Sequence, residues 1–135
     1  MQTISTHRAL VVEDNEHVLY MLDFILSRAG YDVIGVDNGR DAQASIDSIE
    51  PVDIVVLDLM LPYVSGYQLI TNIRDDPEWQ HTPIIVVSGK VLEEDIVKAL
   101  DLGANDYVTK PFRPEELLAR MRRILADHER LASLR

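Results

Sequence analysis

Five polar side chains in this sequence stand at the ends of short apolar runs. Glu13 and Asp14 follow ALVV, Asp58 follows IVVL, Ser88 closes PIIVVS, and Lys110 follows DYVT. If the three carboxylates lie together they repel one another, since two such charges about 4 Å apart cost on the order of 4 kcal/mol at an effective dielectric near 20. A bound cation removes that cost, and a few carboxylates with room for water suit Mg²⁺.

Asp58 is the best placed of these acids to act as a nucleophile. Carboxylates attack phosphoryl groups and form acyl phosphates. Asp58 follows the most apolar run, at the centre of the expected sheet edge, and no neighbouring acid shares its role. Lys110 would put a point charge on one phosphoryl oxygen, and Ser88 would donate a hydrogen bond to another. A dianion fixed there would pull Ser88 and its loop toward it, which is the physical basis of a switch.

These side chains need a scaffold, and the chain alternates apolar runs with amphipathic segments. Runs rich in Val and Ile predict strands over 9–13, 32–36, 53–58, 83–88 and 106–110. Apolar residues at helical spacing predict helices over 18–30, 39–49, 66–74 and 93–103, and from Pro114 almost to the end. We interpret the acids at 93–95 as a solvated helix start. This alternation predicts an α/β fold whose parallel sheet carries helices on both faces, and ligands of such sheets bind at the carboxyl ends of the strands.

Composition narrows the class of protein. With 135 residues the chain has the size of one domain, and its formal net charge of −10 argues against nucleic-acid binding by this chain. It has no cysteine, which excludes disulfides and thiolate metal sites. The first residues do not have the pattern of a signal peptide, and no stretch approaches the ~20 apolar residues that span a bilayer. We therefore expect a soluble, cytoplasmic protein without a membrane partner.

Four motifs resemble those of two-component response-regulator receiver domains. They are VVEDNE with Glu13 and Asp14, VVLDLMLP with Asp58 and Pro62, VVSGK with Ser88, and GANDYVTKPF with Tyr107 and Lys110. Each motif alone is a weak signal, but all four in this order and at this spacing are highly specific. The resemblance covers residues 8–126, and it leaves 1–7 as an N-terminal extension and 127–135 as a C-terminal extension of the last helix.

The resemblance implies a fold and an activity. The fold is flavodoxin-like, (βα)5 and doubly wound, with a five-stranded parallel sheet in the order 2-1-3-4-5. The activity is that of a phosphoprotein in a two-component phosphorelay: a histidine kinase or a histidine phosphotransfer protein donates a phosphoryl group to Asp58. The resemblance also implies that Mg²⁺ takes part in this transfer, held by Glu13, Asp14, Asp58 and the backbone carbonyl of Met60. The resemblance implies no enzyme activity beyond the domain's own phosphorylation and dephosphorylation.

The resemblance also implies a conformational switch. Tyr107 would swing inward when Ser88 moves toward the phosphoryl group. The surface around the fourth helix, the fifth strand and the fifth helix would then change for a downstream output domain or target protein. The family commonly has a cis peptide bond before the proline that matches Pro111.

The sequence gives mixed indications about dimerisation and about attachment to an output domain. Asp106, Glu116 and Arg120 fit the charge pattern of receivers that dimerise through the last two helices and the strand between them. Ile96 and Asn105 depart from that pattern, which has a basic and an acidic residue at these positions, and this argues against a phosphorylation-dependent dimer of that kind. Parts of the chain resemble stand-alone receivers and parts resemble receivers attached to DNA-binding domains. The sequence therefore leaves open whether the switch is stand-alone or part of a longer regulator.

An aspartyl-phosphate hydrolase of the haloacid-dehalogenase type is the alternative class. That class places a second Asp two residues after the nucleophile, and Met60 occupies this position here, which argues against it. Met60 and Lys90 lie two residues after Asp58 and Ser88, respectively. We hypothesise that Met60 and Lys90 tune the access of hydrolytic water to the phosphoryl group.

Overall fold

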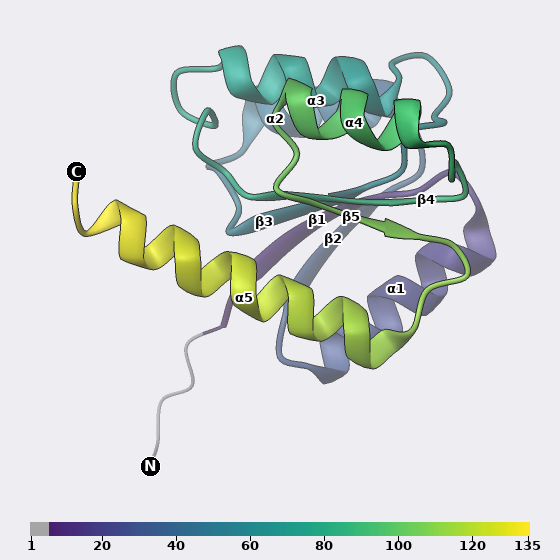
Figure 1. The fold of residues 1–135 in the computed structure, drawn as a ribbon, viewed down its shortest axis with the longest axis horizontal. Helices are drawn as coiled ribbons and strands as arrows, with labels where there is room; N and C mark the ends of the chain where they lie inside the picture. Colours follow the sequence, from purple (N-terminus) through teal and green to yellow (C-terminus); the bar gives the residue numbers. More distant parts are fainter. Residues whose placement is uncertain (1–5) are drawn as a thin grey trace.

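A five-stranded parallel sheet lies at the centre of the computed structural model, which describes residues 6–135 (Figure 1). Its strands are β1 (Arg8–Val12), β2 (Asp32–Val36), β3 (Ile54–Leu57), β4 (Ile84–Ser88) and β5 (Asp106–Thr109), and its helices are α1 (Glu16–Arg28), α2 (Gly39–Ser48), α3 (Gly66–Asp75), α4 (Glu93–Leu102) and α5 (Pro114–Ala132). The strands lie in the order β2-β1-β3-β4-β5, and all neighbouring pairs are parallel. The predicted doubly wound, flavodoxin-like fold and its sheet order are confirmed.

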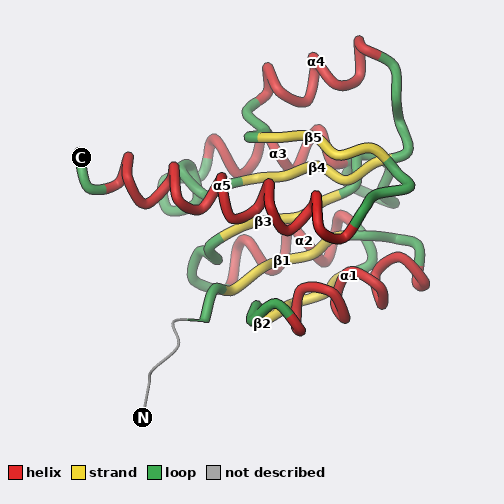
Figure 2. The backbone as a smooth tube through the Cα atoms, turned by 60° about the horizontal axis from the view of Figure 1, so that its bottom comes forward, coloured by secondary structure: helices red, strands yellow, loops and turns green. Residues whose placement is uncertain are grey.

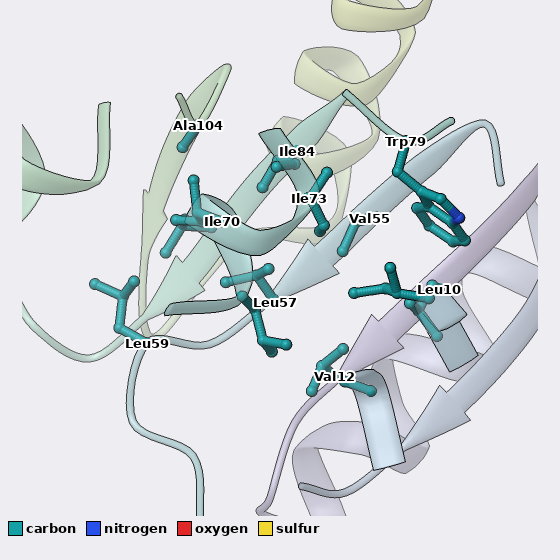
Figure 3. Close-up of a cluster of buried hydrophobic side chains, with 14 of the residues drawn as sticks. Leu10, Val12, Val55, Leu57, Leu59, Ile70, Ile73, Trp79, Ile84 and Ala104 are labelled. Carbon is teal, nitrogen blue, oxygen red and sulfur yellow. The ribbon is translucent and has the colours of Figure 1, made fainter. Parts of the chain in front are cut away.

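Helices cover both faces of the sheet, with α2, α3 and α4 on one face and α1 and α5 on the other (Figures 1 and 2). All residues of β3 are buried between these layers. Val55 and Leu57 belong to the core cluster under α2, α3 and α4 (Figure 3), and Ile54 and Val56 to the cluster under α1 and α5. Burial on both faces is the reason that β3 has an unbroken apolar sequence. It makes the end of β3 a rigid support for the residue that follows.

Three strands end earlier than predicted. The sequence pattern places Glu13, Asp58 and Lys110 inside strands, but in the structure each lies just after the last strand residue. Their amides still donate to the neighbouring strand, to Val36 O at 3.1 Å, Val12 O at 3.1 Å and Ser88 O at 2.9 Å respectively. The ladder ends after these bonds because the chain then turns away from the sheet. The side chains therefore stand at its rim, where the chain can present them to a ligand.

Glycines follow two helices at the predicted positions. Gly30 lies after α1 with φ of 98°, and Gly103 lies after α4 with φ of 126°. Positive φ in this region carries no side-chain penalty for glycine, so glycine ends a helix here at low cost. The helices themselves stop slightly before the predicted boundaries, at Arg28 and Leu102.

The two expected extensions of the domain lie at the ends of the chain, and only part of the N-terminal one is described. Of the expected N-terminal extension, residues 1–5 lie outside the described part of the chain, and β1 begins at Arg8. α5 continues through the segment that the sequence assigned to a helical extension, as far as Ala132, and its end projects past the sheet (Figure 1). Of the helices within residues 6–135, none combines the length and the apolar character that crossing a bilayer demands.

Candidate functional site

Three acids meet at the carboxyl edge of the sheet, as predicted. One oxygen each of Glu13, Asp14 and Asp58 lies within 4.8 Å of the others. Glu13 and Asp58 are only 1% and 7% exposed, whereas Asp14 is open to solvent. Backbone amides hold the two buried carboxylates: Asn15 N donates to Glu13 Oε2 at 3.1 Å, and Met60 N donates to Asp58 Oδ1 at 3.3 Å. The acids thus have fixed positions despite their like charge.

Lys110 bridges two of these acids from the end of β5. Its Nζ lies 2.6 Å from Glu13 Oε1 and 2.9 Å from Asp58 Oδ2. Burial alone would lower the pKa of Lys110, but the contacts with Glu13 and Asp58 outweigh it, so the pKa is raised. Burial raises the pKa of Glu13, against the lowering effect of Lys110. The Lys110 ammonium is therefore charged at neutral pH. Burial disfavours the charged form of Glu13, and Lys110 offsets this effect only in part.

The charge balance of this cluster fits a divalent cation. The three carboxylates face one ammonium, so two negative charges stay uncompensated. Within residues 6–135, the buried Oε1 of Glu13 accepts no hydrogen bond of regular geometry and has only its ion pair with Lys110. Carboxylate oxygens alone, with the exposed Asp14 keeping the site open to water, suit Mg²⁺. The fourth predicted ligand, the carbonyl of Met60, stays a prediction.

The predicted switch residues Ser88 and Tyr107 both contact one residue, Lys90. Ser88 is fully buried, and its Oγ accepts a hydrogen bond from Lys90 N at 3.3 Å. The Tyr107 hydroxyl donates to the Lys90 carbonyl at 2.7 Å, and burial raises the pKa of Tyr107. Both switch residues are therefore connected to the loop between β4 and α4. Separately, the peptide bond between Lys110 and Pro111 is cis, as the resemblance implied.

The side chains of Met60 and Lys90, which are predicted to control water access, have different surroundings. Met60 is 62% exposed beside Asp58. The Lys90 ammonium instead lies 3.6 Å from Asp95 Oδ1 on α4. The sequence interpretation of residues 93–95 as a solvated helix start is wrong for Asp95, which is partly buried and also accepts a hydrogen bond from the Tyr67 hydroxyl at 3.1 Å. No local sequence signal marks this contact, because it depends on how α3 and α4 pack together.

The loop between β3 and α3 fits closely beside Asp58. Gly66 N donates to Leu59 O at 2.9 Å, and a Cβ at Gly66 would overlap the Asp58 carbonyl and lie 2.6 Å from Leu59 Cα. Tyr63 adopts a φ of 73°, and its ring centre lies 4.3 Å from the Arg40 guanidinium carbon. Backbone contacts that only glycine permits therefore set the position of this loop.

Comparisons with known proteins agree on one family. The family model described as response regulator receiver domain matches residues 9–122. The transcriptional regulatory protein KdpE of Staphylococcus aureus is 42% identical over 127 residues, which cover 90% of this chain and 52% of that protein. The chain spans about half the length of the curated relatives it matches.

Solved structures give the same result. A CheY-like response regulator receiver domain protein from Methanospirillum hungatei is similar with a TM-score of 0.86 and 28% identity, covering 93% of this chain and 98% of that one. The receiver domain of a sensor histidine kinase from Pseudomonas aeruginosa, which has a magnesium ion coordinated in its active site cleft, is similar with a TM-score of 0.83 and 30% identity, covering 90% of this chain and 99% of that one.

Proposed function

The chain belongs to the response regulator receiver domain family, and on that premise we propose that it is a phosphoacceptor switch in a two-component system. Asp58 accepts a phosphoryl group from a histidine kinase or a histidine phosphotransfer protein. One observation carries this proposal: a buried carboxylate at the end of the central strand, 2.9 Å from the Lys110 ammonium, within a cluster of three acids. Receiver domains are signalling domains and not classical enzymes, so the only chemistry expected is at Asp58 itself.

The proposed reaction is a phosphoryl transfer between two side chains. A carboxylate oxygen of Asp58 forms a bond to phosphorus while the phosphorus–nitrogen bond of the donor phosphohistidine breaks. The electron pair of that bond returns to the imidazole nitrogen as its lone pair, and the other ring nitrogen carries the proton, so the donor leaves as neutral histidine. Lys110, already paired with Asp58, compensates charge on the arriving phosphoryl oxygens.

A divalent cation completes the proposed site. Glu13, Asp14, Asp58 and the carbonyl of Met60 would hold Mg²⁺, which when bound supplies positive charge to the phosphoryl oxygens. The charge of the three acids, which one ammonium compensates only in part, supports this assignment. The related sensor-kinase receiver with magnesium in its cleft supports it independently.

The proposed switch begins at Ser88. Its hydroxyl oxygen accepts a hydrogen bond from Lys90 N, and we propose that its proton is donated to a phosphoryl oxygen once Asp58 is phosphorylated. Movement of Ser88 shifts the loop that carries Lys90, and with it the carbonyl that the Tyr107 hydroxyl contacts. Tyr107 then changes position, and the surface formed by α4, β5 and α5 changes with it.

Met60 and Lys90 are proposed to control the access of water to the phosphoryl group. Their positions support this role: each lies two residues after Asp58 or Ser88, Met60 is exposed, and Lys90 is partly exposed. We expect Met60→Ala and Lys90→Ala to change the dephosphorylation rate by a few-fold, an effect that the decay of the phosphorylated mass after donor removal measures. If both variants dephosphorylate at the unchanged rate, this role is wrong.

What the phosphorylated domain acts on depends on whether the chain is part of a longer protein. KdpE of Staphylococcus aureus and the phosphate regulon transcriptional regulatory protein PhoB of Pseudomonas aeruginosa are about twice as long as the segments of them that this chain matches. We propose either a stand-alone switch or the receiver of such a regulator. In either case this chain contacts a partner protein through α4, β5 and α5 and does not itself bind nucleic acid, consistent with its net charge of −10.

Intact mass after incubation with a small phosphodonor and Mg²⁺ tests the proposed function. We expect a gain of one phosphoryl group in the wild type and in Asp101→Asn, an exposed acid of α4 that serves as the control. We expect no gain in Asp58→Asn, and none when a chelator replaces Mg²⁺. Labelling that survives in Asp58→Asn would show that the phosphoacceptor assignment is wrong.

A further inference from the structure

Lys90 connects the two switch residues with α4. Its amide donates to Ser88 Oγ at 3.3 Å, its carbonyl accepts from the Tyr107 hydroxyl at 2.7 Å, and its ammonium lies 3.6 Å from Asp95 Oδ1. The backbone of Lys90 is therefore fixed beside Ser88, while its long, flexible side chain is held toward the helix. Its ammonium is paired away from the cluster of acids around Asp58.

Asp95 holds this ammonium from a firm position. The Tyr67 hydroxyl of α3 donates to the same Oδ1 at 3.1 Å, and burial together with Asp95 raises the pKa of Tyr67 to about 12. α3 and α4 lie side by side on one face of the sheet (Figure 1), and Lys98 Nζ lies 4.2 Å from the Tyr67 ring centre. Asp95 is also in the first turn of α4, where the helix dipole favours a negative charge.

The pair between Lys90 and Asp95 is easy to break. Its side chains are 34% and 19% exposed and the distance is long for an ion pair, so solvent screens the attraction. When Lys90 leaves, Asp95 keeps the Tyr67 hydroxyl and the helix dipole, so no charge is left without a partner. A phosphoryl dianion next to Ser88 carries more charge than one carboxylate and competes for the same ammonium.

We propose that Asp95 is a positioning residue that holds the Lys90 ammonium away from the phosphoryl group and thereby shortens the lifetime of the phosphorylated state. The inference rests on the proposed phosphorylation of Asp58. In the phosphorylated chain the Lys90 ammonium is shared between Asp95 and the phosphoryl group. The strength of the Lys90–Asp95 pair thus sets how often the ammonium covers the open side of the site.

The reaction that this cover slows is hydrolysis of the acyl phosphate. A water oxygen forms a bond to phosphorus, the bond from phosphorus to the Asp58 oxygen breaks, and its electron pair returns to the carboxylate. The products are the free carboxylate, hydrogen phosphate and one proton, which goes to solvent. In a loose transition state the charge is spread over the three equatorial oxygens. In this proposal the Lys90 ammonium acts mainly by keeping the attacking water out.

Lifetimes of the phosphorylated chain test this role. The protein is loaded with a small phosphodonor and Mg²⁺, the donor is removed, and the decay of the phosphorylated mass is followed. We expect Asp95→Asn to lengthen the lifetime about two- to fourfold, the range set by the weakness of such pairs. In a Lys90→Met background the same substitution should have no effect, because no ammonium is left to release.

Matched variants separate this role from a structural one. Asp95→Glu keeps the charge and should restore a lifetime close to the wild type. Glu93→Gln removes an exposed charge from the same helix turn and should leave the lifetime unchanged. Tyr67→Phe removes the second donor to Asp95 but keeps the pair with Lys90, so it should change the lifetime less than Asp95→Asn does.

Two results would overturn the inference, and they are distinguishable. If Asp58 takes up no phosphoryl group, the proposed function is wrong and this inference fails with it. If Asp58 is labelled but Asp95→Asn has the wild-type lifetime, or shifts it equally with and without Lys90, the inference alone fails.

Discussion

Asp58 and Glu13 share a single ammonium, and this sharing sets the energetics of the site. Lys110 lies within 3 Å of an oxygen of each, while Asp14 adds a third carboxylate nearby. Removing one acid therefore removes two repulsions and only one attraction, because Lys110 keeps its other partner. We therefore expect the three acids together to destabilise the fold when no cation is bound.

Asp58→Asn should stabilise the protein when a chelator is present. We expect a gain on the order of 1 kcal/mol, which raises the melting temperature by about 3–5 °C in a chain of this size. Saturating Mg²⁺ should stabilise the wild type strongly, by about 2.7 kcal/mol at a hundred times its Kd, and the variant much less. Calorimetry with and without Mg²⁺ checks this, with Asp101→Asn as control. A lower melting temperature for Asp58→Asn in chelator would contradict the clustered-acid account.

Glu13→Gln should change the pH dependence of stability in the metal-free protein. The folded-state pKa of Glu13 is raised above its ordinary 4.5, mainly by burial, so the folded state holds this proton more tightly than the unfolded state does. Its contribution to stability is complete below pH 4.5 and is lost as pH rises through the folded pKa. The stability advantage of Glu13→Gln over the wild type should therefore grow from pH 4.5 to 7. A constant difference across this range would contradict it.

At this scale the sequence predicted which acids converge but not how each is partnered. The carboxyl ends of parallel strands share one edge, so Glu13, Asp14 and Asp58 could be grouped from the strand pattern alone. The pairing of Lys110 with Glu13 as well as Asp58 depends on side-chain reach across two strands. The contact of Lys90 with Asp95 depends on the packing of α4, which a local helix-start signal does not carry.

The elements around the site are held by backbone contacts as much as by apolar packing. β3 is buried on both faces, which fixes the origin of the loop that follows Asp58. α3 begins at Gly66, whose Cα faces the Asp58 carbonyl and Leu59 Cα too closely for a side chain. The position of α3 is therefore coupled directly to the backbone of the phosphoacceptor. Apolar periodicity predicted the existence of α3 but not this contact.

Gly66→Ala should destabilise the fold and slow the labelling of Asp58. The new Cβ would meet backbone atoms, which cannot rotate away, and overpacking of this kind costs about 1–3 kcal/mol. Gly89→Ala is the matched control, because a Cβ there meets no heavy atom within 4 Å and should cost nothing or stabilise by about 0.4–1 kcal/mol. Chemical denaturation and the labelling rate measure both. Wild-type stability and labelling of Gly66→Ala would contradict the coupling.

At the scale of the whole molecule, the surface of α4, β5 and α5 lies at one end of the sheet, next to the proposed switch residues. Arg120 pairs within the chain with Asp106 at 3.0 Å and Glu116 at 3.5 Å. Asn105, which departs from the dimerising pattern, has its side-chain oxygen occupied by Ile84 N and Arg74. The sheet order and the two helix layers were predictable from strand–helix alternation and the family resemblance, but such internal use of a surface position was not.

Phosphorylation should promote a dimer through this surface. We propose that two labelled chains associate through α4, β5 and α5, with Arg120 exchanging its pairs within the chain for acids of the second copy. The labelled chain should then sediment as a dimer, and Arg120→Ala should weaken the association several-fold. Arg123→Ala removes a more exposed charge of α5 and should have little effect. Sedimentation equilibrium with and without the phosphodonor measures this. A labelled chain that remains monomeric would contradict the dimer proposal and leave the phosphoacceptor role intact.

Asp58 is the one carboxylate proposed to take up the phosphoryl group, and mapping the modified residue shows which carboxylate carries it. Hydroxylamine converts an acyl phosphate into a hydroxamate and so marks the carboxylate that carried the phosphoryl group. After loading with a phosphodonor and Mg²⁺, peptide mass spectrometry should find this mark on Asp58 alone, and not without the donor. A mark on Glu13, Asp14 or Asp53 in place of Asp58 would contradict the account.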